Sequence, residues 1–329
     1  MVENHVCEPL LKVEHLKMHY PIRKKLSSKV DAWVKAVDDI SFEVSEGDTF
    51  GLVGESGCGK TTTGKCILRA LDPTGGKILF KGTDLANLQK NQLKPFRRQL
   101  QMIFQDPYGS LDPRQSVYSI LKEAIVTDGN HHASNEVRDR IDELLLTVEL
   151  DPYMRYCYPH EMSGGQRQRL GIARALACDP RLIVCDEPVS ALDVSIQAQI
   201  MNLFRELQKK VGVTYVFIAH DLAVVRHIAT RIAVMYLGKM VETMASEDIY
   251  ENPIHPYTKA LISAIPTTDY HIEKNRKRIL LEGEVPSPIN APRGCPFNPR
   301  CRYATDICRH EMPELIERGD RHFVACHNI

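Results

Sequence analysis

The sequence predicts an α/β fold built on a mainly parallel β-sheet. The short apolar runs TFGLV (49–53), RLIVCDE (181–187) and TYVFIAH (214–220) indicate buried strands, because parallel sheets are covered on both faces and lose the polar alternation of exposed strands. The stretch SIQAQIMNLFRELQKKVG (195–212) follows the second run and places its apolar residues on one helical face. Strands that alternate with helices are typical of this fold class.

An antiparallel part accompanies the parallel one. The stretches LLKVEHLKMHY (10–20) and KAVDDISFEV (35–44) alternate in the manner of antiparallel strands. The stretch IAVMYLGKMVETM (232–244) predicts a hairpin that turns at Gly238. The short apolar runs KILFKG and QMIFQ resemble TFGLV, so we expect both to be buried parallel strands.

The remaining chain divides into a helical region and a distinct tail. From about 116 to 177 the apolar residues recur at helical spacing, and after Ile265 prolines become frequent. We therefore expect a main domain over 1–265 with a helical subdomain at about 106–177. A small, irregular extension rich in Pro and Cys should follow over 266–329.

The composition limits the possible functions. The 329 residues carry 42 basic and 42 acidic side chains, which argues against a nucleic-acid-binding protein. No run approaches the ~18 apolar residues of a membrane span, and the N-terminus lacks the apolar core of a signal peptide. We expect a cytosolic protein whose membrane role, if it has one, comes through a partner.

The stretch GESGCGKTT contains a phosphate-binding loop. Gly54, Gly59, Lys60 and Thr61 match the pattern G-x-x-x-x-G-K-[ST]. Glycines let backbone N–H groups wrap a phosphate, and the helix that follows presents its positive end. The lysine would neutralise the β- and γ-phosphates of ATP, and the threonine hydroxyl is a hard oxygen ligand for Mg²⁺.

Cys58 lies inside this loop and allows two interpretations. It is either a small side chain that fits the space, or a reactive thiol whose pKa is lowered at the helix N-terminus.

The predicted buried strand RLIVCDE (181–187) ends in two acidic residues. Asp186 at the carboxyl edge of the sheet could hold Mg²⁺, directly or through its waters. Glu187 could orient and polarise a water for in-line attack on the γ-phosphate.

A second anion site is indicated by SGGQRQR. Ser163 is a good helix cap, and two glycines expose N–H groups at the start of a basic helix. If this site lies far from the phosphate loop, one chain cannot use both on the same nucleotide. The simplest solution is a dimer in which each chain offers its cap to the ATP of the other.

Together these motifs resemble the ordered motif set of ABC-type ATPases over about 10–240. They are GESGCGKTT, FQDPYGSLDP, SGGQRQR, CDEP, SALD and IAHD. The resemblance implies a P-loop (RecA-like) core with an antiparallel β subdomain and a helical subdomain. It also implies that the nucleotide contacts Gly54, Ser56, Gly57, Cys58, Gly59, Lys60, Thr61 and Thr62.

The same resemblance implies roles for the other motif residues. Glu187 is the general base, His220 contacts the γ-phosphate, and Gln105 senses nucleotide and links to a membrane partner. Ser163, Gly165, Gln166 and Asp193 belong to the dimer-facing motifs, and Thr61, Gln105 and Asp186 form the Mg²⁺ site. Cys58 and Ala219 depart from the residues that are usual at their positions, but neither departure removes a catalytic group.

An aromatic residue should stack on the adenine, since a base needs a flat apolar face. Tyr20 is the candidate, with Trp33 as its rival because a basic insertion lengthens this region. The alternative is that Tyr20 only packs within its strand.

Longer stretches resemble the ATP-binding subunits of bacterial dipeptide and oligopeptide permeases, and the second subunit type of the pair in particular. They include EPVSALDVSIQAQIMNL, NPIHPYTKALISAIP and GEVPSPINAPRGCPFNPRC. The resemblance implies an ATPase at the cytoplasmic face of the membrane that energises peptide import. Its partners would be two integral membrane permease subunits, an extracytoplasmic solute-binding protein, and either a paralogous ATPase or a second copy in a head-to-tail dimer. Importers of nickel or oligosaccharide, a soluble ABC ATPase acting on nucleic acid, and a redox-sensing module are the alternatives.

The tail concentrates four thiols, at Cys295, Cys301, Cys308 and Cys326. In a reducing compartment disulfides are improbable, which leaves free thiols, zinc or an iron–sulfur cluster. Structural zinc prefers closer Cys pairs than these, whereas a cubane suits wider gaps. The negative charge of a cluster would be offset by the nearby arginines Arg293, Arg300, Arg302 and Arg309. The permease resemblance also implies such a cluster. We therefore expect [4Fe–4S], with Zn²⁺ as the alternative.

Overall fold

The computed structural model describes residues 8–23, 30–106, 108–126, 133–266 and 278–329. The chain forms two compact units, one from residues 1–44, 49–87 and 219–329 and the other from residues 45–48 and 88–218. In the described part of the chain, no helix combines the length and the apolar character that crossing a membrane requires.

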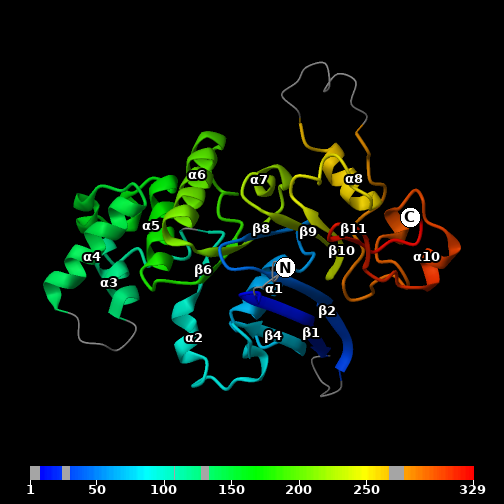
Figure 1. The fold of residues 1–329 in the computed structure, drawn as a ribbon, viewed down its shortest axis with the longest axis horizontal. Helices are drawn as coiled ribbons and strands as arrows, with labels where there is room; N and C mark the ends of the chain where they lie inside the picture. Colours follow the sequence, from blue (N-terminus) through cyan, green and yellow to red (C-terminus); the bar gives the residue numbers. More distant parts are fainter. Residues whose placement is uncertain (1–7, 24–29, 107, 127–132, 267–277) are drawn as a thin grey trace, which may run out of the picture. The chain divides into compact units, whose positions relative to one another are not determined.

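The first unit holds two groups of strands (Figure 1). Its strands are β1 (Leu11–Arg23), β2 (Val30–Val44), β3 (Thr49–Val53), β4 (Gly75–Phe80), β5 (Thr83–Asp84), β9 (Arg231–Tyr236), β10 (Lys239–Ala245), β11 (Ile316–Gly319) and β12 (His322–Val324). Its helices are α1 (Lys60–Ile67), α7 (Leu222–Arg226), α8 (Pro256–Ser263) and α10 (Asp306–His310), with 3₁₀ turns η1 (Leu85–Asn87) and η4 (Asn298–Arg300).

The strand pairing of the first unit confirms most of the expected pattern. β1 pairs antiparallel with β2, β3 pairs parallel with β9, and β9 turns into β10 at Gly238 with φ +77°. The expected parallel arrangement of KILFKG is wrong, because β4 runs antiparallel to β1 with Leu11 opposite Phe80. A short apolar run predicts a strand but not the direction of its neighbour.

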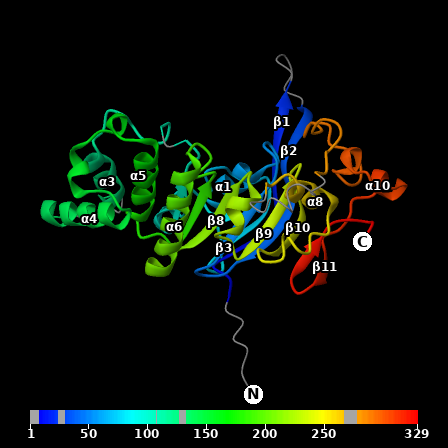
Figure 2. The same ribbon diagram turned by 90° about the horizontal axis from the view of Figure 1, so that it is seen from above.

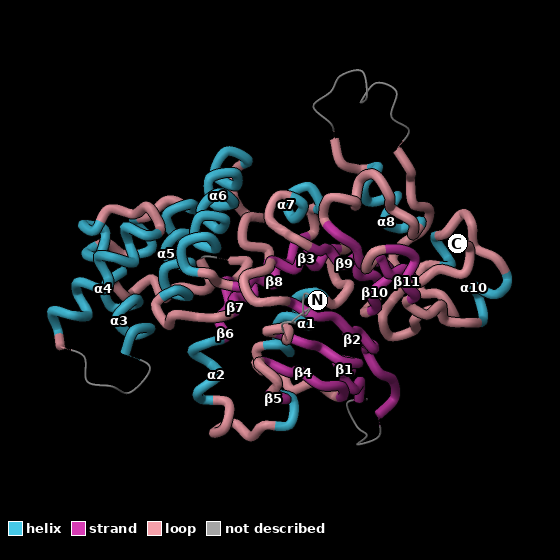
Figure 3. Tube along the Cα trace, viewed as in Figure 1, coloured by secondary structure: helices cyan, strands magenta, loops and turns pink. Residues whose placement is uncertain are grey.

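The C-terminal segment, residues 278–329, adds regular structure to the first unit. β12 pairs antiparallel with both β10 and β11, so the strand order is β11-β12-β10-β9-β3. Figure 3 shows the loops of this segment between α8 and α10. Phe297 and Val324 are buried in the core of the unit, although the extension was expected to be irregular.

The second unit combines parallel strands with helices. Its elements are α2 (Lys94–Gln99), β6 (Leu100–Ile103), α3 (Val117–Val126), α4 (Ser134–Thr147), η2 (Pro152–Tyr156), η3 (Pro159–Glu161), α5 (Gly164–Leu176), β7 (Leu182–Asp186), α6 (Val194–Val211) and β8 (Thr214–Ala219, of which the last residue belongs to the first unit). β7 pairs parallel with β6 and with β8, as expected. Helices α3, α4 and α5 lie together in both ribbon views (Figure 2). Leu203, Phe204 and Leu207 bury the apolar face of α6, whereas Val211 at its end is half exposed.

Candidate functional site

The phosphate loop connects the buried strand β3 to helix α1. Gly59 precedes the helix with φ +106°, and a Cβ atom at this position would lie 2.1 Å from the Ala36 carbonyl oxygen. Only glycine fits there, because a side chain would meet both the backbone strain and the clash. The loop thus leads into the N-terminus of α1, where the N–H groups of a first helical turn favour an anion.

Lys60 is folded back over this loop. Its ammonium Nζ donates hydrogen bonds to the carbonyl oxygens of Gly54 at 2.7 Å and Glu55 at 3.1 Å, and the residue is only 4% exposed. The N–H of Gly238 donates to the Cys58 carbonyl at 2.9 Å, so the β9–β10 turn also holds the loop. A cation fixed at a glycine-rich loop suits a polyphosphate ligand.

Cys58 is a buried thiol within the loop. Burial raises its pKa above the ordinary value, although the neighbouring Lys60 works in the opposite direction. The raised pKa argues against the reactive thiol and favours a small side chain that fills the space.

The two aromatic candidates lie on adjacent strands. The Tyr20 hydroxyl on β1 hydrogen-bonds to the side chain of Thr62 in α1, and burial raises the pKa of Tyr20. Trp33 on β2 is opposite Pro21 and is 47% exposed. The stacking role stays a prediction for either ring.

In the second unit, β7 carries the acidic pair to the edge of the sheet. Asp186 is 4% exposed at the last position of the strand. Glu187 follows with φ +46°, and its N–H donates to the Ile218 carbonyl at 2.9 Å. A left-handed backbone is unfavourable for a glutamate and persists where its surroundings enforce it, which is common at functional sites.

Gln105 meets this glutamate. Its Nε2 donates to Glu187 Oε2 at 3.0 Å, although the two residues are 82 positions apart in the sequence. The structure therefore brings together the predicted sensor and the predicted base within one unit.

Ser163 caps helix α5 as expected. Its Oγ accepts from the Gln166 N–H at 3.3 Å, and the Gln166 side chain accepts from the Ser163 N–H at 2.9 Å. This reciprocal pair is a capping box. Gly165 lies against helix α6, because a Cβ there would be 2.8 Å from Ile196 Cγ2.

The other predicted residues divide between the units. Asp193 is exposed at the start of α6 in the second unit, and the exposed His220 in the first unit directly follows β8. The exposed Ser56 and Gly57 lie at the tip of the phosphate loop, and Thr61 and Thr62 lie in the first turn of α1.

Sequence reasoning missed a group of residues behind the phosphate loop. Arg300 was expected to offset the charge of a metal cluster, but its Nη1 lies 2.8 Å from the carboxylate Oε2 of Glu55 in the loop. Tyr257 accepts a hydrogen bond from the Glu55 N–H at 2.9 Å. No local pattern signals these contacts, since 245 and 202 positions separate the partners.

The chain matches two family models. Residues 37–190 match the model of the ABC transporter, and residues 241–308 match that of the oligopeptide/dipeptide transporter, C-terminal region. The oligopeptide transport ATP-binding protein AppF of Bacillus subtilis is 51% identical over 97% of each chain. The chain belongs to the ATP-binding subunits of oligopeptide ABC transporters. Another relative in this family, OppF of Salmonella typhimurium, is 48% identical over 96% of this chain and 95% of its own.

Solved structures support the ABC ATPase fold. The ATP-binding cassette MJ0796, in a dimeric post-hydrolysis state bound to ADP and Pi, is 27% identical with a TM-score of 0.62, over 72% of this chain and 98% of that one. The cbiO1 protein of Clostridium perfringens is 26% identical with a TM-score of 0.64, over 74% of this chain and 92% of its own.

The expected metal cluster in the tail is wrong. Cys295, Cys301, Cys308 and Cys326 all lie in the described part of the chain, yet no group of three or more His, Cys, Asp or Glu side chains there could hold a metal ion. Burial raises the pKa of Cys295 to about 11, and burial also raises the pKa values of Cys301 and Cys326. A raised pKa disfavours the thiolate form that a metal ligand requires. Relatives such as AppF and OppF are named only as oligopeptide transport ATP-binding proteins. The [4Fe–4S] and Zn²⁺ expectations are both corrected.

Hydrogen bonds and aromatic packing hold the tail instead. Cys295 donates its N–H to the Cys308 carbonyl at 2.9 Å, and Asn298 Nδ2 donates to the carbonyl oxygens of Arg293 and Cys295 at 3.0 and 2.8 Å. Phe297 packs against Tyr236 and Tyr257 with ring centroids 5.3 and 5.4 Å away. Ordinary packing thus accounts for the order of this segment.

Proposed function

We propose that this chain hydrolyses ATP to drive the import of di- and oligopeptides. The observation that carries the proposal is similarity over 97% of the chain to an oligopeptide transport ATP-binding protein, including a match to the peptide-transporter C-terminal region. An importer of nickel or oligosaccharide would share the ATPase core, so the C-terminal match favours peptide.

The residues present fit ATP and Mg²⁺. Lys60 would exchange its carbonyl contacts for the β- and γ-phosphates, and Thr61, Gln105 and Asp186 would hold Mg²⁺ through hard oxygen atoms. The metal ion, when bound, would supply charge neutralisation at the phosphates. Glu187 would orient a water for in-line attack, and Gln105 holds that carboxylate at 3.0 Å. His220 would contact the γ-phosphate.

A dimer would complete the reaction site. The cap formed by Ser163, Gly165 and Gln166 would face the ATP of the opposite subunit, with Asp193 at the interface. The dimeric state of MJ0796 with ADP and Pi supports this proposal. The opposite subunit would be a paralogous ATPase or a second copy of this chain.

The remaining partners and the organisation follow from the same proposal. The chain would act at the cytoplasmic face of the membrane as a peripheral subunit, bound to two integral membrane permease subunits and served by an extracytoplasmic solute-binding protein. It would comprise a nucleotide-binding domain over 1–265, a helical subdomain at about 106–177 that meets the membrane subunits, and an extension over 266–329 rich in Pro and Cys.

The variant Glu187→Gln tests the chemistry. ATP hydrolysis should fall by about 10²- to 10³-fold, while binding of ATP persists because Lys60 and the loop remain. Steady-state phosphate release and binding of a fluorescent ATP analogue measure the two effects. Glu206→Gln is the matched control, since Glu206 is an exposed residue of α6 paired with Lys210. Normal hydrolysis by Glu187→Gln would refute the base assignment.

Uptake of a labelled tripeptide by cells that express the chain with its membrane partners tests the substrate. Uptake that disappears with Glu187→Gln is expected. Uptake of nickel or an oligosaccharide in place of the peptide would select that alternative importer.

A further inference from the structure

The phosphate loop contains an acidic residue that needs an explanation. Glu55 directly follows Gly54, and its side chain is 28% exposed. A carboxylate close to a bound triphosphate repels it, and this repulsion is strong where protein excludes water. ATP binding at this loop therefore benefits from a group that neutralises Glu55.

Arg300 supplies the opposite charge from the C-terminal segment. Its Nη1 donates to Glu55 Oε2 at 2.8 Å and lies 3.5 Å from the Tyr236 hydroxyl, and the arginine side chain is only 8% exposed. A guanidinium buried beside its carboxylate is screened less by salt than a surface pair. The charge of Glu55 is thus offset by a residue 245 positions away.

Tyr257 holds the main chain at the same residue. Its hydroxyl accepts from the Glu55 N–H at 2.9 Å, and the tyrosine on α8 is fully buried. The Glu55 carbonyl in turn accepts from Lys60 Nζ at 3.1 Å. A shift of Glu55 would therefore move an anchor of the lysine that neutralises the phosphates.

The two contacts share one rigid support. Phe297, which is 1% exposed, packs against both Tyr236 and Tyr257, whose rings also contact each other with centroids 4.8 Å apart. The 3₁₀ turn η4 directly follows Phe297 and ends at Arg300. Asn298 pins this turn through its bonds to Arg293 and Cys295. The segment that presents Arg300 is thus part of the core of the first unit rather than a loose tail.

We propose that Arg300 and Tyr257 are positioning residues for ATP binding, through which the C-terminal segment sets both the charge and the backbone position of the phosphate loop. The inference rests on the proposed ATPase function and assigns to residues near the C-terminus a task in the nucleotide site. It also explains how a loop with an acidic second residue binds a polyphosphate.

A double-mutant cycle of Glu55 and Arg300 in the full-length chain tests the proposal. Arg300→Met keeps an unbranched side chain that fills the space of the arginine stem and removes the charge, so it should weaken binding of a fluorescent ATP analogue about tenfold. Glu55→Gln should bind it about two- to threefold more tightly, because Arg300 is then unneutralised. The double variant should return to within about twofold of the wild type, since the repelling carboxylate is gone.

Steady-state kinetics and a control separate positioning from general damage. Arg300→Met should raise the KM for ATP more than it lowers kcat, and the defect should shrink as ionic strength rises. Arg302→Met is the control, since Arg302 is exposed and contacts the Tyr303 ring, so its affinity for ATP should be unchanged. Tyr257→Phe removes only the hydroxyl and should raise the KM a few-fold without salt dependence.

Two results would overturn the proposal. One is a wild-type dissociation constant in Arg300→Met, and the other is a double variant that binds ATP as weakly as Arg300→Met alone. If Arg300→Met does not fold, an unchanged KM for ATP in Tyr257→Phe would overturn the proposal instead. A wild-type chain that binds no ATP would instead refute the proposed function.

Discussion

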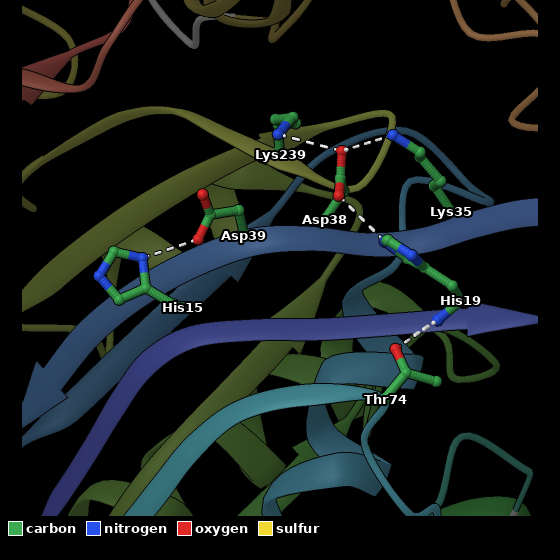
Figure 4. A network of polar contacts seen from close by, with 7 residues as sticks. All are labelled: His15, His19, Lys35, Asp38, Asp39, Thr74 and Lys239. Atoms are coloured by element: carbon green, nitrogen blue, oxygen red, sulfur yellow. Dashed lines mark hydrogen bonds and ion pairs between the residues drawn. The ribbon is translucent and has the colours of Figure 1, made fainter.

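At the scale of single residues, the carboxylate of Asp38 on β2 is contacted by two lysines and a histidine (Figure 4). Its carboxylate lies 3.0 Å from His19 Nε2, 3.5 Å from Lys35 Nζ and 3.1 Å from Lys239 Nζ, and it is 15% exposed. Burial alone would raise the pKa of Asp38, but Lys239 and then Lys35 and His19 outweigh burial, so the pKa lies below its ordinary value of 3.8. These polar contacts link β1, β2 and β10.

This lowered pKa makes stability depend on pH. The unfolded chain binds a proton to Asp38 more readily than the native chain, so the contribution is complete above pH 3.8 and is lost as the pH falls through the native pKa. Asp38→Asn should lower the free energy of unfolding by about 1–2 kcal/mol at pH 7, and the difference should shrink towards about pH 3. Urea unfolding across this pH range measures it.

Asp39→Asn is the matched control for Asp38→Asn. Asp39 is the next residue, is 43% exposed, and pairs only with the exposed His15 at 2.8 Å among the interactions described. Exposed pairs contribute little, so this variant should change stability by less than about 0.5 kcal/mol. An equal effect of the two substitutions would argue against the network.

At the scale of elements, Gly165 sets how closely helix α5 approaches α6. A Cβ at this position would lie 2.8 Å from Ile196 Cγ2, and a β-branched side chain cannot swing far aside. Gly165→Ala should therefore destabilise the fold by about 1–3 kcal/mol through overpacking. Thermal unfolding measures this effect independently of ATP hydrolysis.

The same helix provides the control for Gly165→Ala. Gly171 has nothing within 4 Å of its would-be Cβ. Gly171→Ala should stabilise the helix by up to about 1 kcal/mol, because alanine is the better helix former. If both alanine substitutions stabilise the chain, close packing at Gly165 is not a constraint.

At the scale of the whole molecule, the first unit is assembled from three separate stretches of chain, 1–44, 49–87 and 219–329. Within its last stretch, the fully buried Glu242 on β10 accepts from the N–H groups of Ile254 at 2.7 Å and His255 at 3.1 Å, and lies 2.8 Å from His322 Nε2. One carboxylate thus joins β10, the start of α8 and β12. Burial lowers the pKa of His255 to about 3, so that ring is neutral.

Loss of this carboxylate should loosen the C-terminal segment. Glu242→Ala leaves buried donors without an acceptor and should cost about 3–5 kcal/mol. His322→Ala removes one donor of the set and should cost about 1–2 kcal/mol. Denaturant unfolding of both variants checks the order, and equal stability of Glu242→Ala and the wild type would contradict the role.

Local patterns were sufficient to predict much of the fold and of the candidate site. The phosphate loop from Gly54 to Thr62, the strand that ends at Asp186 and the cap at Ser163 each depend on residues close together in the sequence. Backbone geometry and helix termini act over a few residues, so spacing alone reveals them. The apolar runs likewise predicted β3, β7 and β8, because burial on both faces is a property of each strand.

Only the tertiary structure decided which partners these patterns meet. The apolar run of β4 did not indicate that β4 would run antiparallel to β1, and Cys295, Cys301, Cys308 and Cys326 did not form the expected metal site. Arg300 pairs with Glu55, which is 245 positions away. The cysteines near Arg300 in the sequence had suggested instead that it offsets the charge of a metal cluster. Such contacts depend on how the folded chain brings distant segments together, which spacing along the chain does not encode.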